Sequence, residues 1–103
     1  MIFVIATSEL EDNCRDKFIQ IVKENIPLVL AEDGCISYTL TGDYESGIPA
    51  QSFTGKNTVT FVECWESVEH LKAHLAAPHM DAFREKVQGM RKSSSLKVLT
   101  PVC

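Results

Sequence analysis

The segment Thr58–Phe83, "TVTFVECWESVEHLKAHLAAPHMDAF", contains the change of periodicity that decides the fold. Up to Trp65 the residues alternate between two faces, as they do in a β-strand. After Ser67, apolar residues recur every three or four positions, as they do on one side of a helix. Ser67 can cap the helix, and Glu69 places a negative charge in the first turn, where it suits the helix dipole. We therefore predict a strand over Thr58–Trp65 and a helix directly after it.

The first third of the chain shows the same two periods. Ile2–Ala6 is a continuous apolar run with β-branched residues, which indicates a buried strand. A helix is expected next, capped by Asp12 or Asn13 and ended near Gly34, which is free to take a left-handed conformation. Cys35–Thr41 then alternates between two faces, which predicts the second strand.

The last third of the chain completes the pattern. The helix that begins after Ser67 should run to about Lys92, with an interruption or a restart at Pro78. Ser93–Ser95 is expected to break the structure. Leu96–Val102 then reads as a last strand, and the proline near its end is typical of an edge strand.

The order of elements is therefore β-α-β-β-α-β within a single domain over residues 1–103. This order is typical of an α+β, ferredoxin-like fold, in which an antiparallel sheet carries two helices on one face. The other face of the sheet must be covered, and in so short a chain a second copy is the expected cover. The connection over residues 41–57 is too long for a tight hairpin, so it is either a mobile surface loop or a lid that walls a pocket.

Composition and charge exclude several classes of function. The net charge is −4, from 14 acidic and 10 basic residues, and no basic stripe is present, so nucleic acid is not an expected partner. No apolar run approaches the roughly 20 residues that span a membrane. The first residues lack the basic region of a signal peptide, so a cytoplasmic location is expected. The four cysteines form no C-x-x-C pair, so a zinc ribbon has no support.

The three histidines of the quoted segment should differ in environment. With Val68 at zero and about 100° per residue, the apolar face includes Leu71 at about 300°. His79 then projects at about 20°, in the middle of the buried face. His74 projects at about 240°, on its flank, and His70 at about 200°, toward solvent. We therefore expect His79 inside, His74 beside the core and His70 outside.

Each histidine has a structural and a chemical interpretation. His70 and His74 have the four-residue spacing of a zinc-protease helix, but Leu71 stands where that motif has its glutamate base, so no metal is predicted. An imidazole on an apolar face must form a hydrogen bond or face a cavity. His79 is thus either a core histidine bonded to backbone or a base that lines a cavity, and the same two alternatives hold for His74.

Trp65 and Glu63 share one face of their strand. If that face meets the helices, Glu63 is partly buried and needs a partner, for which His74, His79 and Arg84 are candidates. If it faces a second copy, Glu63 is expected to bond across the interface and Trp65 to anchor it. A partly buried Glu–His pair would tune a proton acceptor near neutral pH.

At these motifs the chain resembles the antibiotic biosynthesis monooxygenase family, whose members include quinol monooxygenases. The resemblance is carried by "EDGCISY" and by "VTFVECWESVEHLKAHLAAPHMDAF". The matching positions are Asp33-Gly34-Cys35 with Tyr38, Glu63 and Trp65, Ser67, His74-Leu75, Pro78-His79 and Phe83. The order of elements extends this resemblance over nearly the whole chain.

The resemblance implies a dimeric α/β barrel with a pocket between each sheet and its helices. It also implies that O₂ oxidises a small aromatic substrate, a quinol or a polyphenol, without metal, flavin or other cofactor. Such chemistry requires a base, a donor for the developing charge and a dry pocket. By this analogy His79 or His74 would be the base and Trp65 a further catalytic residue. Tyr38, Glu63 and Phe83 would bind the substrate.

Two departures from the family pattern affect the prediction. The connection over residues 41–57 is longer than usual, so the mouth of the pocket should differ. The haem-degrading relatives carry an asparagine on the first strand, where this chain has Val4-Ile5-Ala6-Thr7, and this argues against haem degradation. A haem-binding oxygenase and a non-catalytic dimeric protein that binds small molecules or acts in a stress response remain as alternatives.

Overall fold

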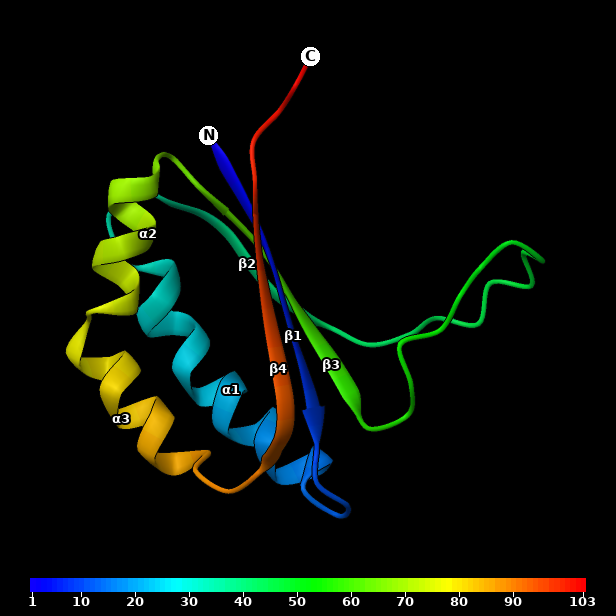
Figure 1. The fold of residues 1–103 in the computed structure, drawn as a ribbon. Coiled ribbons are helices and arrows are strands. Elements are labelled where there is room, and N and C mark those ends of the chain that lie inside the picture. The colour runs from blue at the N-terminus through cyan, green and yellow to red at the C-terminus, as the bar shows by residue number, and fades with distance from the viewer.

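Four antiparallel strands form one sheet in the order β2-β3-β1-β4, and the helices pack on one of its faces (Figure 1). The computed structural model describes all residues, 1–103. The elements are β1 (Ile2–Leu10), α1 (Arg15–Leu30), β2 (Cys35–Thr41), β3 (Thr58–Trp65), α2 (Val68–Leu75), α3 (Pro78–Lys86) and β4 (Arg91–Leu99). The predicted ferredoxin-like α+β fold is confirmed. A single copy is an open sheet and not a closed barrel.

The core lies between the sheet and the helices because one face of each strand is apolar. In the antiparallel pair of β1 and β3, Val4 stands opposite Glu63 and Ala6 opposite Phe61, all on the helix side. Phe18 of α1 packs edge-on against Phe61, with ring centroids 6.5 Å apart. Trp65 is fully buried, and a side chain of that size contributes a few kcal/mol through the apolar area it removes from water.

The bounds of β1 and β4 differ from the prediction. β1 continues past Ala6 to Leu10, which is fully buried. β4 starts at Arg91 and ends at Leu99, so the prediction of a break at Ser93–Ser95 and of a strand over Leu96–Val102 was wrong. The serines pair with Thr7, Ser8 and Glu9 of β1. An edge strand needs only backbone hydrogen bonds and tolerates exposed polar side chains, so its weak apolar pattern concealed it.

The helices also differ from the prediction in number and in their ends. The predicted restart at Pro78 is confirmed, because Ala77 before it has an extended backbone (φ −67°, ψ 142°) and α2 and α3 are separate helices. The expected end near Lys92 was wrong, because α3 ends at Lys86. Three helices therefore cover the sheet where two were expected. The prediction of a cap at Asp12 or Asn13 was wrong: α1 begins after Cys14, whose side chain makes no capping hydrogen bond. Ser67 caps α2 as predicted, accepting from the backbone N–H of His70 at 3.3 Å.

Residues 42–57 form an arm that projects from the sheet on the side away from the helices (Figure 1). The Asp43 carboxylate closes its base by accepting from the N–H groups of Thr54, at 2.9 Å, and Gly55, at 3.0 Å. These backbone hydrogen bonds lower the pKa of Asp43. Its large apolar side chains, Tyr44, Ile48 and Phe53, are exposed. They therefore do not anchor the arm to the rest of the chain. The arm does not line the cavity beside His74.

None of the helices is long and apolar enough to cross a bilayer.

Gly34 joins α1 to β2 at a point where no side chain fits. Its φ of +81° is in the left-handed region, and a Cβ there would overlap the ring of His70. Its carbonyl accepts from the N–H of Glu66 at 2.9 Å, which holds the start of α2 beside the end of α1. The predicted left-handed conformation is confirmed.

We expect Gly34→Ala to destabilise the protein by more than about 2 kcal/mol, because it adds backbone strain and displaces His70. Gly47→Ala is the matched control: Gly47 also has a positive φ, +76°, but its Cβ would meet open space. It should cost only about 1 kcal/mol. Urea unfolding followed by Trp65 fluorescence measures both, and equal losses would contradict the steric role of His70.

Candidate functional site

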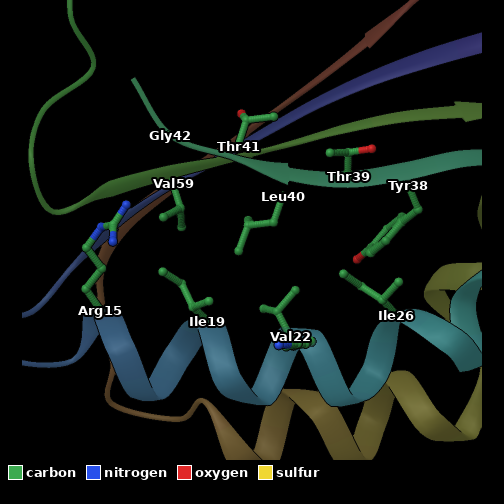
Figure 2. Close-up of a pocket in the computed structure, with 11 residues that line it drawn as sticks. Arg15, Ile19, Val22, Ile26, Tyr38, Thr39, Leu40, Thr41, Gly42 and Val59 are labelled. Carbon is green, nitrogen blue, oxygen red and sulfur yellow. The ribbon is translucent and has the colours of Figure 1, made fainter. Parts of the chain in front are cut away.

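Two cavities lie between the helices and the sheet. The larger, of about 320 Å³, lies between α1 and β2 and includes only Tyr38 of the predicted site residues (Figure 2). The smaller, of about 140 Å³, lies between the sheet and the helices α2 and α3. Four of the six predicted site residues line it: Tyr38, Glu63, His74 and Phe83. Trp65 does not line it but packs against His74, and His79 borders a separate hollow between α1 and α3.

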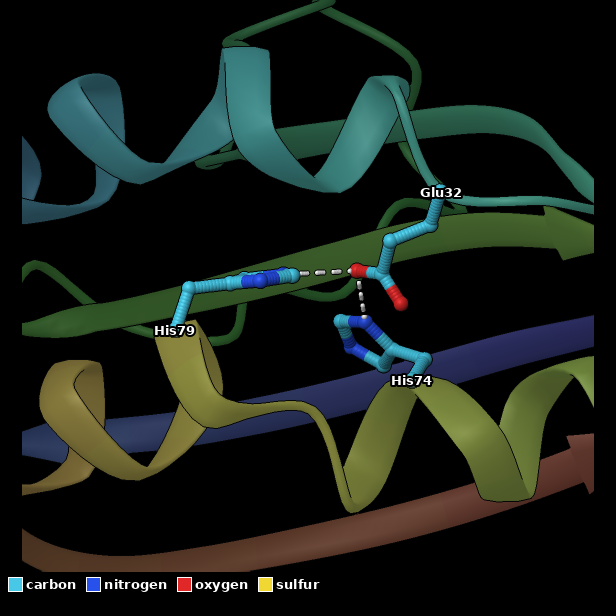
Figure 3. Close-up of side chains that lie close together, drawn as sticks. All are labelled: Glu32, His74 and His79. Carbon is cyan, nitrogen blue, oxygen red and sulfur yellow. Dashed lines mark hydrogen bonds and ion pairs between the residues drawn. The ribbon is translucent and has the colours of Figure 1, made fainter.

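A carboxylate that the sequence prediction did not include organises this site. Glu32 follows the end of α1, and one of its oxygens, Oε2, lies 2.7 Å from Nδ1 of His74 and 2.9 Å from Nε2 of His79 (Figure 3). His74 is in the last turn of α2 and His79 in the first turn of α3. Because the chain turns at Ala76-Ala77 between the two helices, both imidazoles reach the same oxygen.

The shared carboxylate assigns the tautomer of each neutral imidazole. An ionised carboxylate only accepts hydrogen bonds, so Nδ1 of His74 must carry its proton and donate to Glu32. In the neutral ring the other nitrogen, Nε2, then holds a lone pair. It has no hydrogen-bond partner within the chain, and His74 lines the smaller cavity. The geometry therefore provides an oriented proton acceptor at that cavity.

Aromatic rings hold this imidazole in place. The ring of Trp65 lies 4.6 Å from that of His74, centroid to centroid, with an interplanar angle of 35°. Tyr38 meets His74 edge-on at 5.6 Å. The exposed fraction of His74 is 2%, so the ring has little freedom to turn and little contact with solvent. An electrostatic interaction is stronger in such a low-dielectric setting than in water.

Glu63 is a buried carboxylate that lines the smaller cavity. Its strand face meets the helices, which was one of the two alternatives from the sequence. None of the predicted partners His74, His79 and Arg84 hydrogen-bonds to it. Instead, the indole N–H of Trp65 donates to Oε1 of Glu63 at 3.0 Å. Burial raises the pKa of Glu63, and the Trp65 hydrogen bond and the charge of His74 oppose that rise only in part.

The burial of the histidines differs from the order predicted by a continuous helix. His74 is the buried one and His79 is partly exposed, whereas the prediction placed His79 at the centre of the buried face. The turn before Pro78 starts α3 at a new angle, so positions can no longer be counted from Val68. His70 is not free in solvent either. Its Nδ1 lies 2.6 Å from Oγ of Ser67, and its Nε2 3.4 Å from a carboxylate oxygen of Asp33.

Arg91 is another residue of the cavity that the sequence prediction missed. Its guanidinium lies over the rings of Phe18, at 5.5 Å, and Phe83, at 6.0 Å. Its Nε is buried and has no hydrogen-bond partner. Burial lowers its pKa. The prediction placed position 91 at the end of a helix, whereas it is the first residue of β4, and only there does its side chain reach the cavity.

Glu32, His74 and His79 are also the side chains with suitable chemistry for a metal ion, with their ligand atoms within 4.8 Å of one another. Ligands around zinc, at bonds of about 2.0–2.1 Å, stand about 3.3 Å apart. The O–N separations of 2.7 and 2.9 Å are hydrogen-bond lengths, so the three side chains would have to move apart by about half an ångström to hold such an ion. These distances favour two histidine N–H groups that donate to one oxygen of Glu32 over three ligands of a metal ion.

Comparison with known proteins identifies a family and a common fold. The family model described as antibiotic biosynthesis monooxygenase matches residues 1–86. The Escherichia coli K12 protein "Probable quinol monooxygenase YgiN" is 38% identical over 86 residues, which are 84% of this chain and 78% of that protein. Among solved structures, Rv0793 from Mycobacterium tuberculosis superimposes with a TM-score of 0.80 at 23% identity, covering 99% of this chain and 95% of that one. PA3566 from Pseudomonas aeruginosa gives 0.80 at 17% identity, covering 99% and 94%. At these identities the two structures show a common fold.

The raised pKa of Glu63 predicts a pH dependence of stability. Because the folded state binds this proton more tightly than the unfolded state, stability from this group is present below the unfolded pKa and falls as pH rises through the folded pKa. We expect Glu63→Gln, which cannot ionise, to lose less stability than the wild type between about pH 4 and neutral pH. Urea unfolding at a series of pH values measures this, with the exposed Glu69→Gln as control. A wild-type slope retained in Glu63→Gln would contradict the assignment.

Proposed function

Because the chain belongs to the antibiotic biosynthesis monooxygenase family, we propose that it oxidises a quinol or a related polyphenol with O₂, using no metal or flavin. The observation that carries this proposal is the pairing of Glu32 with His74. It leaves Nε2 of a buried, oriented imidazole as the free proton acceptor of a mostly apolar cavity. The name of the Escherichia coli relative supports a quinol as the substrate class.

The reaction begins with loss of a phenolic proton. Nε2 of His74 takes that proton, and the Glu32 carboxylate, already bonded to Nδ1, stabilises the imidazolium that forms. The phenolate is electron-rich enough to pass an electron to O₂. For a quinol the overall balance is quinol plus O₂ to hydroxyquinone plus water. Base catalysis of this kind contributes about 10²- to 10⁴-fold to rate.

Residues that line the cavity or contact His74 and Glu32 have supporting roles in this proposal. His79 shares the Glu32 oxygen, so it positions the carboxylate and is not the first proton acceptor. The indole N–H of Trp65 is already bonded to Glu63, so Trp65 acts by stacking on His74. Phe83 and Tyr38 contact the substrate ring, and Arg91 provides a positive charge for the anion that forms.

The size of the cavity bears on the alternatives. At about 140 Å³ it lies below the roughly 300–1,000 Å³ of typical ligand pockets. It matches a small ring system better than a haem. The haem-binding alternative has no specific feature in its favour, and Soret absorbance during a haemin titration tests it. A non-catalytic binding protein is the alternative that an absence of O₂ uptake would favour.

We expect His74→Asn to lower quinol-dependent O₂ uptake at saturating substrate by about 10²-fold or more, because it removes the base. Glu32→Gln should lower it by a smaller factor, since it weakens the orientation and the charge stabilisation of the imidazolium. His70→Asn is the matched control, a histidine of the same helix that does not line the cavity. An oxygen electrode and metal-free, flavin-free protein provide the measurement. Unchanged uptake in His74→Asn would contradict the role of His74, and no uptake with any quinol in the wild type would contradict the enzyme.

The proposed function includes a homodimer formed through the outer face of the sheet. Phe3 pairs in register with Leu99 of β4 and with Cys64 of β3, and Val62 lies on the same face. Phe3, Val62 and Leu99 have exposed fractions of 37%, 40% and 47%. A contiguous apolar patch on the uncovered side of a sheet is typical of an interface.

Light scattering at micromolar concentration should give twice the 11.5 kDa mass of the chain. Val62→Lys should shift the protein to the monomer, because it places a charge in the centre of the patch. Gln20→Lys adds the same charge on the exposed side of α1 and should leave the dimer intact. A monomeric wild type would contradict the proposal.

A further inference from the structure

The larger cavity, which we call the α1–β2 groove, is not used by the proposed reaction. Its volume is about 320 Å³, within the range of small-molecule sites. Its walls are apolar side chains of α1, β2 and β3 that face one another across the space (Figure 2). They are Ile19, Val22, Ile26, Leu40 and Val59. An occupant must therefore have an apolar body.

The charged side chains of the groove are all cationic. Arg15 and Lys23 belong to its lining, which contains no acidic residue. The ion pairs of the chain involve His70, His74, His79 and Arg84, so neither cation has a carboxylate within ion-pair distance. The chain as a whole has a net charge of −4, whereas the lining of this groove is positively charged.

The guanidinium of Arg15 is placed to bind an anion. Its Nε is buried without a hydrogen-bond partner, which costs free energy unless a ligand supplies an acceptor. Arg15 reaches from the first turn of α1 toward β2 at one end of the groove (Figure 2). Asp43 and Glu45 border a separate hollow on its other side, and neither forms an ion pair with it. A carboxylate would be bound here by charge-assisted hydrogen bonds.

The other end of the groove offers a neutral donor. Tyr38 directs its hydroxyl toward α1, and this hydroxyl has no hydrogen-bond partner within the chain (Figure 2). Burial is the main cause that raises its pKa, so it remains a protonated donor at neutral pH. The hydroxyl of Thr41 is not available, because it donates to the carbonyl of Thr60 at 2.7 Å. The polar contacts of the groove thus stand at its two ends.

We propose that the α1–β2 groove is a second binding site, which takes an amphiphilic monocarboxylate with a body of about two fused rings. The carboxylate binds Arg15 at one end, the apolar body lies on the walls, and the far end reaches the hydroxyl of Tyr38. Tyr38 also lines the reaction cavity and meets His74 edge-on. A ligand in the groove therefore contacts the wall of the reaction cavity without entering it.

The test uses 2-naphthoate and its neutral isostere 2-naphthamide as probes, with affinities measured by titration calorimetry. Naphthoate should bind more tightly than naphthamide. Arg15→Gln should weaken naphthoate by about tenfold or more, because a hydrogen bond to a charged group is lost, and should leave naphthamide nearly unchanged. Lys17→Gln is the matched control, an exposed lysine of the same helix outside the groove. It should change neither affinity.

Two further variants locate the bound probe. Leu40→Phe reduces the space of the groove and should weaken both probes. Arg91→Gln removes a cation that lines the reaction cavity and not the groove, so it should leave naphthoate binding intact. The readout is binding, so this test does not depend on catalysis. Loss of binding in Arg91→Gln together with retention in Arg15→Gln would place the probe in the reaction cavity and overturn the proposal. Absence of naphthoate binding at millimolar concentration would also overturn it.

Discussion

The hydrogen bonds from two histidines to one oxygen of Glu32 are the interaction on which the helical layer depends. They connect the end of α1 to the last turn of α2 and the first turn of α3. His74 is almost completely buried, and its only polar partner in the chain is this carboxylate. Loss of the acceptor would leave a buried donor unpaired, which costs about 1–3 kcal/mol. The same bond that joins the helices also determines which nitrogen of His74 can accept a proton.

The break between α2 and α3 is what makes this arrangement possible. In one continuous helix, His74 and His79 would be separated by five positions and would project in directions about 140° apart. The extended backbone at Ala77, imposed by Pro78, starts a new helix and turns His79 back toward Glu32. Pro78, which takes no part in the proposed chemistry, thus brings the two imidazoles together. The new direction of α3 also places Phe83 at the cavity.

Tyr38 separates two spaces with different character. On the side of α2 and α3, its ring edge contacts His74 in a small cavity that also contains a buried carboxylate and the guanidinium of Arg91. On the side of α1, its hydroxyl faces a larger groove whose charges are cationic. Tyr38 is on β2, an edge strand of the sheet, and the two spaces on either side of it are covered by different helices. The fold therefore provides one oriented base and, apart from it, one place suited to an anion.

The sequence by itself determined the order of strands and helices along the chain, the ferredoxin-like sheet and four residues that line the reaction cavity, Tyr38, Glu63, His74 and Phe83. These follow from local periods, since alternation in β3 and helical spacing after Ser67 depend only on neighbouring residues. It could not identify Glu32 or Arg91 as site residues, and it assigned the wrong order of burial to His74 and His79. Glu32 is 42 positions from His74, and Arg91 reaches the cavity only because β4 begins five residues earlier than its apolar pattern suggested. Such contacts depend on how α1, α3 and β4 pack around the sheet, and only the tertiary structure decides that geometry.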